Sequence, residues 1–215
     1  MNSYSAIHRR NLGLALLALS PLPAQAQTRP APRALATIAM VGDLVREIGG
    51  GRIRAETLIG EGVDPHLFRP TRADIARVLG ADIIFANGHR LEGRMGDVLA
   101  RASASGKPVV MVAESLPRAR LRANPEYPDA ADPHLWMDPV LWAEAAGSIS
   151  VALGRLLPES AALFDANLTT LRARLAALHE YGARVMASIQ PRQRLLVTAH
   201  DAFGYFAARY GLEVD

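Results

Sequence analysis

Short apolar runs alternate with segments of helical periodicity between residues 35 and 112. A short continuous apolar run is typical of a strand buried on both faces, whereas apolar residues three and four apart indicate a helix. Repeated alternation of the two is characteristic of βαβ units, so this region predicts a parallel sheet. The predicted strands cover residues 35–41, 53–59, 82–86 and 107–112. One helix is predicted after Gly42, a second after Thr71, where Asp74 resembles the acidic residue of a capping box, and a third over residues 92–104.

Longer helices dominate the second half of the chain. Asp138–Pro139 has the residue types of an N-cap and a first helical position, which predict a helix to about residue 157. One apolar stripe then follows residues 158–190, where a helix would extend roughly 50 Å, longer than one small lobe requires, and could bridge two lobes. Residues 195–198 and 201–210 predict one further strand and helix. Because these two elements cannot close a core, we expect the second lobe to be only begun at residue 215.

The N-terminus has the order of features of a secretory signal peptide, predicted at residues 1–26. His8–Arg10 supplies the positive charge, residues 12–22 form a short apolar stretch, and Ala24–Ala26 resembles a cleavage site. Eleven apolar residues are too few to span a bilayer, which takes about 20 in a helix. We expect residues 27–34 to be flexible and the mature protein to be exported. With no cysteine to carry a lipid, we expect it to be free in a periplasm.

Composition excludes several classes of protein. The chain is 50% hydrophobic and 21% charged, a globular rather than a disordered balance. The absence of cysteine excludes a disulfide scaffold and a thiolate metal site. The net charge is only +3. The sequence also lacks a basic stripe with interleaved aromatic residues, the pattern that would indicate nucleic-acid binding. The common catalytic signatures are also missing: His179–Ala183 lacks the second histidine of a zincin, and Gly106–Lys107 lacks the earlier glycine of a P-loop.

Three of the six histidines share a context. His66, His134 and His200 each lie in a loop between an extended segment and the start of a helix. In open α/β sheets such loops face the ligand crevice, and three imidazoles there would suit a borderline divalent metal. From spacing alone, unrelated capping or surface roles are equally compatible. The remaining histidines are interpreted as His8 in the signal peptide, His89 in a surface loop and His179 on a solvated helix face.

Four separated motifs carry a resemblance to a known family. Residues 62–71, 87–93, 132–139 and 197–206 resemble, in this order, the TroA-like solute-binding receptors of zinc and manganese ABC importers. The resemblance runs from about residue 35 to residue 215. It implies an α/β fold with two lobes and mostly parallel sheets, joined by one long rigid helix. The lobe boundaries would be residues 35–157 and 191–215, with the helix at 158–190 between them.

The resemblance also implies a site and a function. The family's ligand positions fall on His66, His134 and His200, while its fourth, acidic ligand has no counterpart in these 215 residues. Manganese-dedicated relatives tend to have Glu at the third position, so the nitrogen-rich set favours Zn²⁺ over Mn²⁺. We therefore expect a monomeric, non-enzymatic receptor that delivers Zn²⁺ (alternatively Mn²⁺) to a membrane permease. The alternative is an exported zinc-dependent hydrolase that uses the same three histidines.

The polar and aromatic neighbours of these histidines are interpreted as structural. Asp138 and Asp201 are expected to cap helices, although Asp201 could instead orient a ligand ring. The nearby aromatic residues are expected to pack in the core rather than form a ligand cage; they are Trp136, Phe203, Tyr205 and Phe206.

Overall fold

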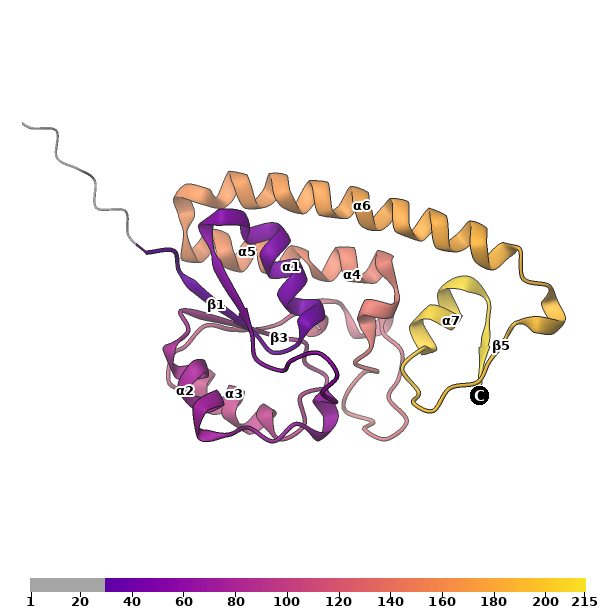
Figure 1. Ribbon diagram of the computed structural model, residues 1–215, viewed down its shortest axis with the longest axis horizontal. Coiled ribbons are helices and arrows are strands. Elements are labelled where there is room, and N and C mark those ends of the chain that lie inside the picture. Colours follow the sequence, from indigo (N-terminus) through magenta and orange to yellow (C-terminus); the bar gives the residue numbers. More distant parts are fainter. Residues whose placement is uncertain (1–29) are drawn as a thin grey trace, which may run out of the picture. The chain divides into compact units, whose positions relative to one another are not determined.

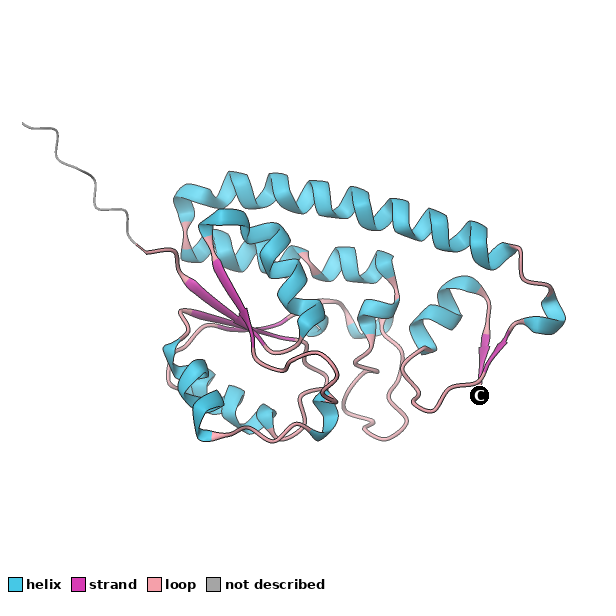
Figure 2. Ribbon diagram, in the orientation of Figure 1, coloured by secondary structure: helices cyan, strands magenta, loops and turns pink. Residues whose placement is uncertain are grey.

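The computed structural model describes residues 30–215, and the predicted signal peptide lies outside the described residues. A four-stranded parallel sheet forms its centre (Figures 1 and 2). The strand order is β2-β1-β3-β4, with β1 at Arg33–Ala36, β2 at Arg54–Thr57, β3 at Ile83–Ala86 and β4 at Val109–Met111. The α/β class with a parallel sheet is thus confirmed. Residues 33 and 34, expected to be flexible, are already paired with Arg54 and Ala55.

The first predicted strand is too long. It was expected over residues 35–41, but β1 ends at Ala36 and α1 (Ala39–Gly49) begins three residues later. Val41, Val45 and Ile48 are fully buried along one face of this helix. A short apolar run does not distinguish a buried strand from the first turn of a buried helix, and here the helix takes it.

Two helices cover the opposite face of the sheet from α1. The first, α2 (Arg72–Gly80), starts with the predicted capping box: Thr71 Oγ1 accepts from the Asp74 N–H, and the Asp74 carboxylate accepts from the Thr71 N–H. The second, α3 (Met95–Ala104), begins three residues later than predicted, because residues 89–94 form turns. Apolar side chains of α1, α3 and the sheet share one core.

The single helix predicted for residues 139–157 is two helices, α4 (Pro139–Ala145) and α5 (Gly147–Leu156). The long helix α6 (Ala161–Ala187) follows after one 3-10 turn. Its 27 residues extend about 40 Å, less than the predicted 50 Å, because the helix is shorter at both ends. None of the helices in residues 30–215 is long and apolar enough to cross a membrane.

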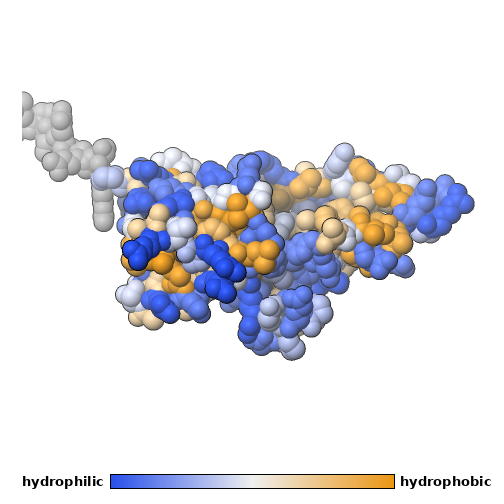
Figure 3. Space-filling model, turned by 60° about the horizontal axis from the view of Figure 1, so that its bottom comes forward, coloured by the Kyte–Doolittle hydropathy of each residue, from blue (hydrophilic) through white to orange (hydrophobic). Residues whose placement is uncertain are grey.

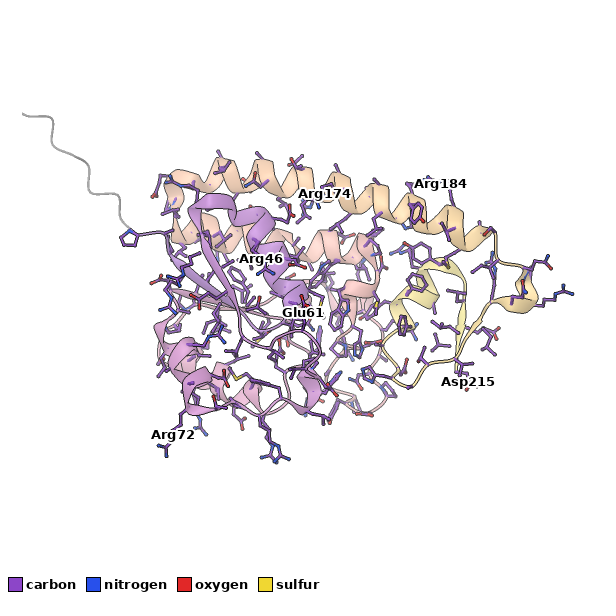
Figure 4. The ribbon with its side chains drawn as sticks, viewed as in Figure 1. Arg46, Glu61, Arg72, Arg174, Arg184 and Asp215 are labelled. Atoms are coloured by element: carbon purple, nitrogen blue, oxygen red, sulfur yellow. The ribbon has the colours of Figure 1, made fainter. Side chains whose placement is uncertain are left out.

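The two halves of α6 have different surroundings. Phe164, Leu168 and Leu171 of its first half are buried against α1, α4 and α5. At the surface, Arg174 of α6, labelled in Figure 4, forms an ion pair of 2.7 Å with Glu47 of α1. In the second half, apolar side chains such as Leu178 are exposed. The face in Figure 3 shows separate hydrophobic patches among hydrophilic ones rather than one continuous apolar surface.

A small second unit of structure follows α6. It consists of β5 (Leu195–Leu196), α7 (Gly204–Tyr210) and β6 (Glu213–Val214), and the two strands pair in parallel. The sequence predicted only one strand and one helix here, because the two-residue strand β6 is too short to leave a pattern. Helix α7 contacts both α6 and the 3-10 turn Leu135–Met137, which precedes α4.

Candidate metal centre

The structure brings His66, His134 and His200 together. Their ligand nitrogens all lie within 4.8 Å of one another. The Nε2 atom of His134 is central, at 3.2 Å from Nε2 of His66 and 3.2 Å from Nε2 of His200. His134 is buried, His66 is half-buried and His200 is exposed. The cluster is therefore open to solvent on the side of His200.

Local hydrogen bonds hold the loop of His66. The residue lies in the 3-10 turn Pro65–Leu67, and Asp64 Oδ1 accepts from its backbone N–H at 2.9 Å. On the other side, Gly93 approaches so closely that a Cβ atom there would lie 2.4 Å from the His66 carbonyl oxygen. The turn around residue 93 is thus in direct contact with the backbone that carries this histidine.

Asp132 orients His134. Its Oδ1 atom accepts from the backbone N–H of His134 at 2.9 Å and from the ring Nδ1 at 2.8 Å. Donation from Nδ1 assigns the ring proton to that nitrogen, so the lone pair is on Nε2, the atom that faces the other two imidazoles. A carboxylate behind a histidine in this way fixes the ring and raises its basicity as a metal ligand.

The electrostatics around His66 favour its neutral form. Burial, and then the positive charge that His134 would carry, hold the pKa of His66 below its ordinary value, while Asp64 acts in the opposite direction. Only the neutral ring can offer a lone pair to a metal. His66 therefore remains in its binding form at a lower pH than an isolated histidine.

The buried carboxylate of Glu92, to which the sequence analysis assigned no role, supports the loop that carries His134. Glu92 is 2% exposed; its Oε1 atom accepts from the Thr37 hydroxyl at 2.7 Å and the Asn87 N–H at 2.6 Å. Asn87 in turn donates through Nδ2 to the Pro133 carbonyl at 2.9 Å, immediately before His134. The network joins the carboxyl ends of β1 and β3 to the His134 loop. Burial raises the pKa of Glu92.

The two other described histidines lie outside the cluster, but neither is a simple surface residue. His89 is half-buried, and its Nδ1 accepts from the Ala131 N–H at 3.3 Å. His179, expected on a solvated helix face, is half-buried with its Nδ1 3.4 Å from the Tyr210 hydroxyl. Their contacts come from segments more than 30 residues away, which local periodicity does not reveal.

The interpretation of the two aspartates is right for one and wrong for the other. Asp138 caps α4: Oδ1 accepts from the N–H groups of Val140 and Leu141. Asp201 caps nothing, because α7 begins only at Gly204 and no side chain bonds to its first turn. Of the aromatic residues, Tyr205 is buried in the core as expected, and Trp136 is half-buried with its ring edge-on to His134.

Comparison with known proteins places the chain in a family. The sequence model of ZnuA, the periplasmic zinc-uptake complex component A, matches residues 35–215. The chain belongs to this family. It is 38% identical over 183 residues to the zinc-binding protein TroA of Treponema pallidum, and 35% identical over 179 residues to the manganese-binding lipoprotein MntA of Bacillus subtilis. These alignments cover 85% and 83% of this chain, but the chain spans only 58% of the length of either relative.

The fold agrees with the family. The solved structure of the periplasmic zinc-binding protein TroA of Treponema pallidum superimposes with a TM-score of 0.81 at 37% identity, over 86% of this chain and 65% of that one. None of these ZnuA-family relatives supports the hydrolase alternative.

Two of the relatives are named lipoproteins: MntA, and SloC of Streptococcus mutans, which is 25% identical over 83% of this chain and 60% of its own length. The expectation of a receptor without a lipid anchor is therefore not borne out.

Proposed function

We propose that this chain is the metal-capturing part of a non-enzymatic receptor of an ABC importer. It takes up Zn²⁺, with Mn²⁺ as the alternative cargo, on the periplasmic side of the membrane and delivers the ion to a permease. The observation that carries the proposal is the convergence of three imidazole nitrogens in a member of the ZnuA family. Residues 35–157 would form the metal-binding lobe, residues 158–190 the connecting helix and residues 191–215 part of a second lobe of a monomer.

The ligands in this proposal are His66, His134 and His200. Zn–N bonds of about 2.0–2.1 Å in a tetrahedral site put neighbouring ligand nitrogens roughly 3.3 Å apart. Two of the nitrogen pairs here are already 3.2 Å apart. The ion would therefore enter with little rearrangement around His134. Three neutral nitrogen donors suit Zn²⁺ better than Mn²⁺, which prefers oxygen.

Zinc titration of single-residue variants tests the ligand set. His66→Ala, His134→Ala and His200→Ala should each lower Zn²⁺ affinity strongly in calorimetry, whereas His89→Ala and His179→Ala should leave it nearly unchanged. The same titrations with Mn²⁺ in competition establish the preferred cargo. A strong loss with His179→Ala and none with His200→Ala would overturn the assignment.

A further inference from the structure

Helix α7, which follows His200, is held against residues 122–138 by two polar contacts. Tyr205 is 2% exposed; its hydroxyl donates to the Asp132 carbonyl at 3.0 Å and accepts from the Arg122 N–H at 3.1 Å. One turn further along, Arg209 reaches the carboxylate of Asp138 with Nε at 2.9 Å and Nη2 at 2.7 Å. We call these two contacts the α7 latch.

The latch attaches α7 to the segment that carries the central histidine. Asp132 holds His134 with its side chain and receives Tyr205 with its backbone carbonyl. Asp138 lies four residues after His134 and caps α4, and the Asp138 side chain is only 4% exposed. One stretch of seven residues, 132–138, therefore fixes His134 and also receives α7.

On its other side the loop of His200 is tied only to the small unit to which α7 itself belongs, where the Thr198 N–H donates to the Asp215 carbonyl at 3.1 Å within the described residues. The hydrogen bonds to the backbone of His200 itself are local: Thr198 Oγ1 and the Ala202 N–H both donate to the His200 carbonyl, at 2.9 and 2.8 Å. His200 and Asp201 are exposed. The position of this imidazole relative to His134 thus follows from where α7 docks, four residues later in the chain.

Helix α7 also lies close to Arg122, which precedes Asp132 in the chain. A Cβ atom at Gly204 would lie 2.6 Å from Nε of Arg122, so the start of α7 lies against the loop that precedes Asp132. Loss of the Tyr205 hydroxyl would leave the Asp132 carbonyl and the Arg122 N–H without this partner. A buried polar group without a partner is unfavourable, and small shifts of α7 would restore a partner to these groups.

We propose that Tyr205 is a positioning residue for the metal site: through the α7 latch it sets His200 opposite His134 before any ion arrives. This role rests on the proposed function, because it presupposes that His200 is a ligand. The competing interpretation is that Tyr205 only packs in the core, in which case its hydroxyl has no specific effect on metal binding.

Tyr205→Phe in the full chain tests the role, with Tyr210→Phe as the matched control. Both substitutions remove one hydroxyl from α7, but that of Tyr210 faces His179, which lies outside the cluster. We expect Tyr205→Phe to weaken Zn²⁺ binding about 10- to 100-fold, the usual effect of losing a partner behind a metal ligand, and Tyr210→Phe to change it less than twofold. With Co²⁺ as probe, only Tyr205→Phe should alter the visible spectrum of the bound ion, which reports ligand geometry.

A double-mutant cycle separates positioning from general damage. In a His200→Ala background, Tyr205→Phe should cause no further loss of Zn²⁺ affinity, because the ligand through which it acts is gone. An equal loss in both backgrounds, or no loss in the parent, would overturn the positioning role alone. No effect of His200→Ala itself would overturn the ligand assignment and the positioning role with it.

A second variant covers the case that Tyr205→Phe does not fold, which melting of the metal-free protein would reveal. Arg209→Gln opens the other contact of the α7 latch at a half-buried position. It should lower Zn²⁺ affinity with the same dependence on His200. A folded Arg209→Gln protein with the affinity of the parent would count against the latch.

Discussion

Substitution of Gly93 by alanine should damage the metal site without touching any imidazole. Gly93 has a φ of +48°, and an added Cβ atom would lie 2.4 Å from the carbonyl oxygen of His66. Contacts under 3.0 Å are not tolerated, so the two backbones must separate by at least about 0.6 Å. Binding sites depend on ligand placement to within about 0.5 Å. We therefore expect Zn²⁺ affinity to fall about 10- to 100-fold, as it does when a ligand's support is lost.

Gly106→Ala is the matched control. Gly106 also has a positive φ, +87°, but nothing lies within 4 Å of the position its Cβ would take. Both variants adopt an unfavourable backbone conformation, which costs on the order of 1–3 kcal/mol of unfolding free energy. Only Gly93→Ala adds the clash with the His66 loop.

Two measurements separate the effects. Denaturant unfolding of the metal-free proteins should show destabilisation of both variants, larger for Gly93→Ala because of the clash, and competition with a chelator should show weaker Zn²⁺ binding for Gly93→Ala alone. Equal Zn²⁺ affinities of the two variants would refute the reasoning, since the contact between residue 93 and the His66 carbonyl would then have no influence on the site.

Three further results are expected. Asp132→Asn should lower Zn²⁺ affinity about 10- to 100-fold in calorimetry, because His134 loses the carboxylate at its Nδ1; unchanged affinity would show that the carboxylate does not matter. Zn²⁺ affinity should be constant above neutrality and fall as the pH drops below the ordinary histidine value of 6.5, and the lowered pKa of His66 keeps that ring neutral to a lower pH than an isolated histidine; titrations from pH 8 to 5 test this, and a flat profile would exclude histidine ligands. Phe164→Ala should lower the free energy of unfolding by about 3–5 kcal/mol and the exposed Leu178→Ala by about 0.5 or less in denaturant melts; similar values would contradict the burial assigned to α6.

The sequence was informative wherever a signal is local. Strands β3 and β4 were predicted from short apolar runs between turn residues, which are typical of strands in a parallel sheet, and β2 was predicted from the alternation of residues 53–59. The capping box at Thr71 and the N-cap at Asp138 were predicted because capping depends on side chains two or three residues away. The three histidines were selected because each lies in a loop before a helix. In an α/β fold such loops lie at the same edge of the sheet, so the position in the chain was the signal.

What the sequence did not reveal depends on contacts between distant segments. Glu92 bonds to Thr37 across 55 residues, and Arg209 pairs with Asp138 across 71. Such pairs leave no periodic pattern, since either partner alone looks like an ordinary polar residue. The misassigned first strand has a different cause: its last residues are apolar enough for a strand or a buried helix, and packing in the folded protein decides between them.

The spacing of the three histidines also determines when in the life of a chain the site can exist. His66 and His134 are 68 residues apart, and His134 and His200 are 66 apart. In an unfolded chain, bringing the ends of each such loop together costs roughly 4 kcal/mol of entropy beyond a constant term. A chain whose residues around 200 have not yet emerged or folded therefore lacks the assembled centre. Under the proposed ligand set, metal binding by all three histidines becomes a sign of completed folding, and a bound ion in turn selects the folded chain over the unfolded one.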